Sequence, residues 1–260
     1  MTTALITGAS TGIGDKFARE LASRETNLVL VARSQDKLDS LATELSNKYQ
    51  IKTTVIAQDL ITVGARQVVF DKVQAQGLTI DLLINNAGFG DYGAFSDRPL
   101  SKMMEMVQLN IAAVVELTGL FLPLMQARKD GAIINVSSIA AFQPIPYMSV
   151  YAASKAFILS FSEALWAENK DLGVKVLAVC PGPTESEFYD RANFPNSATV
   201  LNKTTMASAE KVVQESLNAL NKNYSTAVVG GFANQIIVNL PRLMPRDLLV
   251  NVVGKQFKNI

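Results

Sequence analysis

A tyrosine and a lysine stand four residues apart, at Tyr151 and Lys155, within a stretch of helical periodicity. This spacing places both side chains on one face of a helix. A free phenol has a pKa of about 10 and is a weak base at neutral pH, but a neighbouring ammonium group favours the phenolate. We therefore expect Lys155 to lower the pKa of Tyr151. Tyr151 then gives a proton to a carbonyl oxygen or takes one from an alcohol.

Two serines and an asparagine add polar groups that fit the same chemistry. Ser137 and Ser138 end a predicted strand shortly before Tyr151, and a hydroxyl there can hold a substrate oxygen as charge develops on it. Asn110 lies in a long apolar helical stretch, where a buried amide without a partner costs about 1 to 3 kcal/mol. We expect Asn110 to join a polar network, and the sequence leaves open whether that network is structural or catalytic.

Each of these side chains also has an ordinary structural explanation. Tyr151 can cover core surface, Lys155 can lie in solvent, and the serines can cap the next helix. The sequence contains no histidine and one cysteine, Cys180, which excludes Ser-His-Asp hydrolysis, Cys-His chemistry and a His- or Cys-rich metal site. Because no other chemical group competes, we interpret Tyr151, Lys155 and Ser138 as catalytic and expect no metal.

The composition limits the compartment and the partners. A lone cysteine cannot form an internal disulfide, and the first residues lack the charged and apolar regions of a secretory signal, so we expect a cytoplasmic setting. The net charge of +1, with basic residues scattered along the chain, argues against nucleic-acid binding. No uninterrupted apolar run approaches the roughly 20 residues that cross a bilayer.

Short apolar segments alternate with longer segments of helical periodicity. The predicted strands are 4–7, 28–31, 53–57, 82–85, 132–136, 174–179 and 227–229. The predicted helices are 14–23, 36–48, 62–76, 99–127, 150–169 and 208–221. This alternation predicts an α/β fold: a doubly wound (Rossmann), mostly parallel sheet of about seven strands with helices on both faces. The whole chain, 1–260, is expected to form a single domain.

Two segments in the second half of the chain fall outside this alternation. The polar, weakly periodic segment 184–207 is predicted to form a mobile cap near the active site. The apolar segment 232–260 is broken by prolines and charged residues and predicts short amphipathic helices. Such helices can pack on the core, on a partner chain or on a membrane surface, and the sequence does not choose among these.

A glycine-rich turn joins the first strand to the first helix and predicts a dinucleotide site, although a turn of this kind can also be a simple tight connection. Its predicted cofactor-binding positions are Gly8, Ser10, Gly12, Ile13 and Gly14. Missing side chains let the backbone approach a pyrophosphate, and the helix N-terminus offers free N–H groups. In doubly wound sheets such ligands lie at the carboxyl ends of the strands.

The next strand ends extend this site. Arg33 follows the second strand, where an acidic residue would bind the ribose of NAD and an arginine can pair with the 2′-phosphate of NADP. Since a solvated arginine is the alternative, the sequence prefers NADP(H) and leaves NAD(H) open. The positions expected to contact the adenosine, at the third and fourth strand ends, are Asp59, Leu60, Asn86, Ala87 and Gly88.

Together these motifs resemble the short-chain dehydrogenase/reductase family, over about residues 3–188. The matching positions are Gly8, Gly12, Gly14, Asn85-Asn86-Ala87-Gly88, Asn110, Ser138, Tyr151, Lys155 and Pro181-Gly182. The resemblance implies a tetrad of Asn110, Ser138, Tyr151 and Lys155, in which Lys155 also binds the nicotinamide ribose and Asn110 holds a water of a proton relay. It further implies Ser138 rather than Ser137, because the family serine usually stands thirteen residues before the tyrosine.

The same resemblance extends to the nicotinamide and to the partners. Pro181 and Gly182 match the family's proline-glycine turn, and the backbone of Thr184 would contact the nicotinamide amide. The C-terminal part looks like that of hydroxysteroid- and fatty-acyl-type reductases, which implies a hydrophobic substrate. Self-association as a homodimer or homotetramer, through helices 99–127 and 150–169, is expected by the same likeness.

We therefore predict an oxidoreductase that transfers a hydride between NADP(H) and a carbonyl or secondary alcohol, on a substrate such as a ketoacyl or steroid-like ketone. Phe142, Tyr147, Phe188 and Phe194 indicate an apolar pocket for it. The alternative is an NADP(H)-binding regulatory or scaffold protein without significant turnover, which has no need of a proton donor. Peripheral membrane contact through 232–260 stays open.

Overall fold

The computed structural model describes residues 2–195 and 206–258. Strands and helices alternate along the chain, as the sequence predicts. The strands are β1 (Thr3–Thr7), β2 (Asn27–Ala32), β3 (Thr53–Ala57), β4 (Leu82–Asn85), β5 (Gly131–Val136), β6 (Val174–Pro181) and β7 (Thr226–Val229). The helices are α1 (Gly12–Ser23), α2 (Gln35–Tyr49), α3 (Ala65–Ala75), α4 (Leu100–Val107), α5 (Ala113–Arg128), α6 (Ser149–Asn169), α7 (Phe188–Arg191), α8 (Ala209–Asn221), α9 (Phe232–Asn239) and α10 (Arg246–Lys258).

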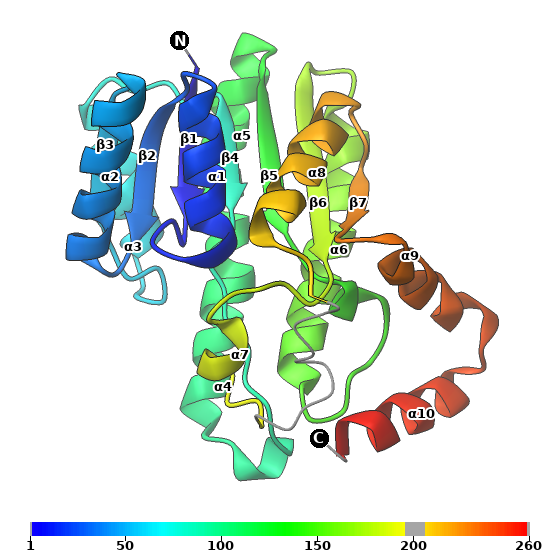
Figure 1. The fold of residues 1–260 in the computed structure, drawn as a ribbon. Coiled ribbons are helices and arrows are strands. Elements are labelled where there is room, and N and C mark those ends of the chain that lie inside the picture. The colour runs from blue at the N-terminus through cyan, green and yellow to red at the C-terminus, as the bar shows by residue number, and fades with distance from the viewer. Residues whose placement is uncertain (1, 196–205, 259–260) are drawn as a thin grey trace.

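The strands form one parallel sheet in the order β3-β2-β1-β4-β5-β6-β7. Leu5 of β1 pairs in register with Val29 of β2 on one side and with Leu83 of β4 on the other. Figure 1 shows α1, α2 and α8 on one face of the sheet, and α3, α5 and α6 on the other. The predicted doubly wound fold is confirmed, and its strand order reverses between β1 and β4, where ligands bind in such sheets.

Most strand residues are apolar because both faces of the sheet are covered. Successive residues of β1 point to opposite faces. Ile6 packs in the core under α1, α2 and α8, while Leu5 packs in the core under α3 and α5. Phe17 of α1 and Phe121 of α5 fill these two cores with large, fully buried rings. This packing fixes the strands whose carboxyl ends carry the site.

The predicted helix 99–127 is a continuous helical rod, formed by α4, a π-helical turn at Gln108–Ala112 and α5. The rod, Leu100–Arg128, is long and apolar enough to cross a membrane by length and composition alone. One side of it packs in the core on the sheet, so we interpret it as a crossover helix. The π-helical turn carries Asn110, whose side chain is buried.

Most predicted element boundaries lie within a residue or two of the observed ones. The largest difference is at α3, for which the prediction starts at residue 62 and the helix starts at Ala65. Two-residue differences occur at the start of α1 and at the end of β6. Gly64 precedes α3 with a φ of 79°. This left-handed conformation prevents the helix from starting before Ala65. The apolar periodicity of the sequence does not reveal this boundary.

The predicted cap, 184–207, is described at its two ends. The first part contains the short helix α7, and 196–205 lie outside the described residues. Thr184 forms a parallel bridge with Ala207, and the backbone N–H of Glu185 donates to the Ala207 carbonyl at 3.1 Å. Both ends of the cap are therefore fixed close to the carboxyl end of β6, next to the expected site.

The described part of 232–260 forms α9, a 3-10 turn at Leu240–Leu243 and α10, which confirms the predicted short helices. In Figure 1 these helices leave β7 and run along the carboxyl side of the sheet, away from the N-terminus. Gly254 lets α10 pack on the loop before α6, since a Cβ there would lie 3.3 Å from the Pro146 ring. One side of these helices therefore packs on the core, and contact of the other side with a partner chain or a membrane surface stays open.

Candidate active site

A cavity of about 840 Å³ lies at the carboxyl ends of the strands. It begins at the glycine turn after β1, passes the loops after β2, β3 and β4, and continues beside Ser138, Tyr151 and Lys155. It ends between α7 and the C-terminal helices. The cavity thus joins the two predicted sites, one for a dinucleotide and one for proton transfer, in a single space.

The glycine turn forms one wall of this cavity, which is lined there by Gly8, Ser10, Gly12 and Ile13. Gly8 has a φ of +66°, which favours glycine, and it lies so close to Ala87 that a Cβ would be 3.0 Å from the Ala87 Cα. The side chain of Thr11, the N-cap residue of α1, makes no capping hydrogen bond, so the first N–H groups of the helix are available to an anion. This wall fits a pyrophosphate.

Gly14 does not line the cavity, and its contact with the cofactor stays a prediction. A Cβ at Gly14 would lie 2.3 Å from the carbonyl oxygen of Gly8 and 2.6 Å from Nδ2 of Asn86. The glycine is needed because helix α1 approaches the turn closely. Gly14 therefore allows α1 to pack closely on the glycine turn that forms the cavity wall.

Asn86 and Thr7 hold the glycine turn against the loop after β4. Nδ2 of Asn86 donates to the Thr7 carbonyl at 2.9 Å, while Oγ1 of Thr7 accepts from the backbone N–H groups of Asn86 and Ala87, each at 3.0 Å. The sequence predicts Asn86 at the adenosine and does not single out Thr7. A hydroxyl at the end of an apolar strand is the signal that could have identified it.

Arg33, predicted to bind the 2′-phosphate, lines the cavity at the end of β2. The predicted adenosine-contacting residues also line it, after β3 and β4: Asp59, Leu60, Asn86, Ala87 and Gly88. Arg33 is exposed at the cavity edge, where it can reach a phosphate. Oδ1 of Asp59 accepts from the backbone N–H of Ile61 at 3.1 Å, which holds the carboxylate in place. The residues present therefore fit an NADP-type dinucleotide in charge and in space.

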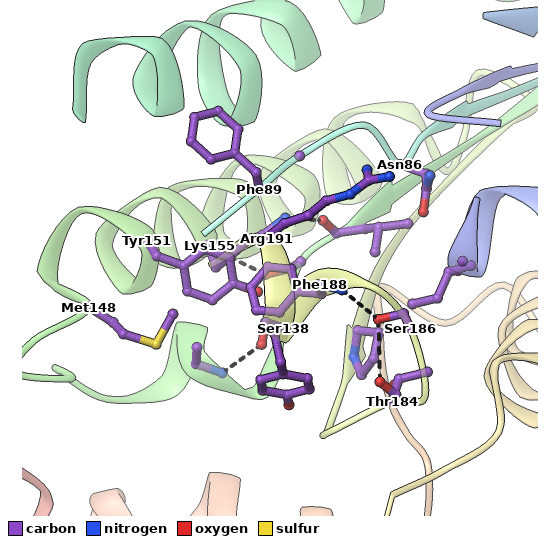
Figure 2. Close-up of a pocket in the computed structure, with 18 of the residues that line it drawn as sticks. Asn86, Phe89, Ser138, Met148, Tyr151, Lys155, Thr184, Ser186, Phe188 and Arg191 are labelled. Carbon is purple, nitrogen blue, oxygen red and sulfur yellow. Dashed lines mark hydrogen bonds between the residues drawn. The ribbon is translucent and has the colours of Figure 1, made fainter. Parts of the chain in front are cut away.

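The two serines after β5 have separate roles. Ser137 is buried, and its hydroxyl donates to the backbone carbonyl of Lys155 at 2.7 Å. Oγ of Ser138 accepts from the backbone N–H of Ala140 at 3.1 Å and lines the cavity (Figure 2). Because this cap uses only the oxygen, the Ser138 O–H group can still donate into the cavity. The geometry agrees with the prediction of Ser138 over Ser137.

Tyr151 and Lys155 lie on one face of α6, and Nζ of Lys155 is 5.8 Å from the centre of the tyrosine ring. Nζ donates to the carbonyl of Val136 at 2.8 Å. Burial raises the pKa of Tyr151 to about 12, although a hydrogen bond with Ser138 acts in the opposite direction. Burial also lowers the pKa of Lys155 to about 8.

These pKa directions correct one expectation. Lys155 was expected to lower the pKa of Tyr151, but in the protein alone the loss of solvent around the phenol raises this pKa, and the effect that acts in the opposite direction is the hydrogen bond with Ser138. Tyr151 is therefore protonated at neutral pH. A protonated phenol in the cavity is suited to donate a proton to a carbonyl oxygen, which is the reductive direction.

Asn110 does not line the cavity. Its Oδ1 accepts from the backbone N–H of Phe89 at 3.1 Å, and its Nδ2 donates to the Phe89 carbonyl at 2.9 Å and to Oγ of Ser154 at 3.1 Å. Ser154 in turn donates to the carbonyl of Tyr151 at 2.7 Å. The expected polar network is present, and it ties the loop after β4 to the turn of α6 that carries the tyrosine.

The substrate end of the cavity is apolar. Phe188 and Phe194 line it together with Met148 and Ile145, whereas Phe142 and Tyr147 do not. Figure 2 shows Met148 on one side of Tyr151 and the Phe188 ring on the other, toward Ser186. Pro181, Gly182 and Thr184 line the cavity after β6, as predicted, and Oγ1 of Thr184 donates to the Gly182 carbonyl at 2.9 Å.

One wall of the cavity was not predicted from the sequence; α9, α10 and the segment between them form it. Ile237, Leu240, Met244, Leu249, Val252 and Val253 line it. The amphipathic pattern of 232–260 predicted helices but did not say what their apolar faces cover. Their place against the catalytic cluster follows from packing between segments far apart in the sequence.

A doubly wound sheet with a glycine turn at its switch point and a buried tyrosine and lysine beside it defines the class of dinucleotide-dependent oxidoreductases. A family model described as "short chain dehydrogenase" matches residues 2–195. The chain therefore belongs to the short-chain dehydrogenase family and is an oxidoreductase, which confirms the resemblance drawn from the sequence.

Known proteins similar to the chain agree with this assignment. A very-long-chain 3-oxoacyl-CoA reductase of Anas platyrhynchos is 34% identical over 275 residues, covering 99% of this chain and 80% of the relative. A short-chain dehydrogenase of Sphingobium yanoikuyae, solved in complex with NADPH, has a TM-score of 0.82 at 29% identity, covering 100% of this chain and 96% of that one. A bulky-bulky ketone specific alcohol dehydrogenase of Comamonas testosteroni has a TM-score of 0.78 at 29% identity, covering 94% and 92%.

Proposed function

We propose that this protein uses NADPH to reduce the ketone of 3-oxoacyl thioesters with long apolar chains. One observation carries the proposal: a single cavity joins the glycine turn, the pair of Ser138 and Tyr151, and an apolar wall from the C-terminal helices. The very-long-chain 3-oxoacyl-CoA reductase of Anas platyrhynchos, which aligns with nearly the whole chain, supports the same substrate class.

The glycine turn and the N-terminus of α1 are proposed to hold the pyrophosphate of NADPH, and Arg33 its 2′-phosphate. Lys155 and the backbone of Thr184 are the groups proposed for the nicotinamide ribose and amide. When bound, NADPH supplies the hydride that adds to the carbonyl carbon.

Ser138 and Tyr151 then act on the carbonyl oxygen. The Ser138 O–H donates a hydrogen bond to it, which stabilises the negative charge that develops there. Tyr151 transfers its phenolic proton to the same oxygen, so that the ketone becomes a secondary alcohol and the tyrosine a phenolate. Because its pKa is raised, Tyr151 is a weak acid. It therefore transfers the proton only as negative charge builds up on the carbonyl oxygen.

Lys155 and Asn110 support this proton transfer. The lowered pKa of Lys155, about 8, allows its amine to gain and lose a proton near neutral pH, so it can return a proton to the phenolate. Asn110 acts as a positioning residue, because its contacts reach Tyr151 only through Ser154. A water held by Asn110, which the family resemblance implies, is compatible with this arrangement.

The test is NADPH oxidation with a series of 3-oxoacyl thioesters, followed by absorbance. Tyr151→Phe should lower kcat/KM by roughly 10² to 10⁴-fold, because the general acid is lost, without a change in the unfolding midpoint. Tyr224→Phe, which removes an exposed hydroxyl, is the matched control and should be unaffected. Full activity of Tyr151→Phe would contradict the mechanism. An inactive wild type that still binds NADPH would instead support a regulatory role.

A further inference from the structure

The C-terminal helices make an apolar wall that continues from the catalytic tyrosine to the surface. Leu249 and Val253 of α10 are buried in the same hydrophobic cluster as Tyr151 and Met148. Met244, from the segment before α10, packs against this cluster and also lines the cavity. The wall therefore starts at the reacting group itself.

The outer part of the wall is open to solvent. Leu240 and Val252 both line the cavity and are each 50% exposed, so they mark a place where the cavity reaches the surface. Leu248, four residues before Val252 on α10, is similarly exposed, at 52%, but does not line the cavity. Leu240 and Val252 thus lie at the mouth of the cavity, whereas Leu248 lies on the outer face of α10.

The wall is held in place at both of its ends. The hydroxyl of Tyr92 donates to the backbone carbonyl of Phe257 near the end of α10, and Gly254 packs on Pro146. On the other side, Nδ2 of Asn234 in α9 donates to the carbonyl of Val229 at 2.9 Å. These contacts connect α9 and α10 to the loops around the site, so the wall is part of the folded cavity.

The chemistry of the wall selects its ligand. Its polar lining residue is Gln256, and the charged lining residues come from other elements: Arg33, Asp59, Lys102, Glu105, Lys155, Glu187 and Arg191. A charged or hydroxylated group would lose water on this wall without gaining partners, whereas an alkyl chain would lose only unfavourable contact with water.

From these observations we infer that the wall of α9 and α10 is the binding site for the unbranched alkyl chain of the substrate, and that chains longer than the wall leave the protein past Leu240 and Val252. The inference rests on the proposed function and adds to it the residues that recognise the chain. Each methylene covered by the wall should strengthen binding by roughly fourfold, the equivalent of its removal from water. An open end should set no upper limit on chain length.

The experiment compares Val252→Asp with Leu248→Asp in the full-length protein. Both variants add the same charge to α10, but only the first places it on the wall. For Val252→Asp we expect kcat/KM with a 3-oxohexadecanoyl thioester to fall by at least about tenfold, and kcat/KM with a 3-oxobutanoyl thioester to change less than about twofold. Leu248→Asp should leave both values unchanged.

Equal losses on both substrates, or equal losses in both variants, would overturn the inference, as would a wild type whose kcat/KM does not rise with chain length. A second readout does not need turnover: calorimetric binding of saturated butanoyl- and hexadecanoyl-CoA, which carry no ketone. Tighter binding of the longer chain, weakened by Val252→Asp, is expected even if no 3-oxoacyl thioester is reduced. In that case the proposed function fails and the chain site stands; absence of any preference for the longer chain removes the site.

Discussion

The ring of Phe188 lies over the ring of Tyr151, with 5.2 Å between their centroids and an angle of 50° between their planes. Phe188 belongs to α7 in the cap. Its ring fills space that is free because Gly90 has no side chain: a Cβ on Gly90 would lie 2.7 Å from Cζ of Phe188. A cap residue thus contributes to the burial that raises the pKa of Tyr151 (Figure 2).

Removing this cover should make the tyrosine more acidic. In Phe188→Ala, water reaches the phenol, so we expect the pKa of Tyr151 to fall from about 12 toward its ordinary value of 10. Alcohol oxidation needs the phenolate, so the rising limb of its pH profile should move to lower pH, by about half a unit or more. Gly90→Ala, which displaces the ring, should act in the same direction.

Phe157→Ala provides the control for this shift, because Phe157 is exposed on the same helix as Tyr151. If the limb keeps its position in Phe188→Ala, the ring does not contribute to the pKa of Tyr151.

Lys155 should reduce the stability of the folded protein at neutral pH. Its folded-state pKa of about 8 is below the ordinary 10.5, so protonation is less favourable in the folded state than in the unfolded state. This cost is largest below about pH 8 and disappears as the pH rises toward 10.5. At pH 7, Lys155→Met should raise the free energy of unfolding by about 1 to 3 kcal/mol, partly offset by the lost bond to Val136, while abolishing turnover.

Urea unfolding at a series of pH values measures this difference. The advantage of Lys155→Met over wild type should narrow as the pH increases through 8. Lys175→Met, at an exposed position on β6, should show no such dependence. A pH-independent difference between wild type and Lys155→Met would show that the lysine is charged in both states.

Arg33 should set the preference between cofactors. In Arg33→Ala we expect the KM for NADPH to rise roughly tenfold to hundredfold, because a charge-assisted bond to the 2′-phosphate is lost, and the KM for NADH to stay nearly constant. Steady-state kinetics with both cofactors give the ratio. Arg24→Ala, which removes an exposed arginine paired with Glu20, is the control. Equal effects on NADPH and NADH would mean that Arg33 does not read the phosphate.

Asn110 should contribute to stability as well as to rate. Asn110→Ala leaves the backbone N–H and carbonyl of Phe89 without their bonds, so we expect the free energy of unfolding to fall by about 1 to 3 kcal/mol. Ser154→Ala, which removes the third partner, should reproduce a smaller part of this loss and leave the Phe89 contacts intact. Urea unfolding and kcat are measured together; a drop in kcat without loss of stability would assign Asn110 to a proton relay alone.

Features with a local pattern could be predicted from the sequence. The glycine turn, Arg33 at a strand end and the four-residue spacing of Tyr151 and Lys155 each follow from one element and its period. The sheet follows as well, because apolar strands separated by amphipathic helices have few other arrangements. Self-association and a cytoplasmic setting stay predictions.

Features that depend on burial or on distant partners could not be predicted. The raised pKa of Tyr151 comes from rings and helices that surround it in space, among them Phe188 from the cap. The three bonds of Asn110 connect it to Phe89 and Ser154 through folding. Gly14 belongs to the glycine motif, from which we predicted a contact with the cofactor. The structure shows that close packing of α1 on the turn also requires this glycine.

A hydrogen bond runs from the hydroxyl of Tyr92 to the backbone carbonyl of Phe257. It fixes the end of α10 beside the cavity, so a fusion partner or a surface linker attached after Lys258 would stand next to the substrate entrance. The start of β1 lies on the opposite side of the molecule (Figure 1). Immobilisation through the amino end would leave the entrance facing solution, and we expect sensor measurements made in that orientation to match those in free solution.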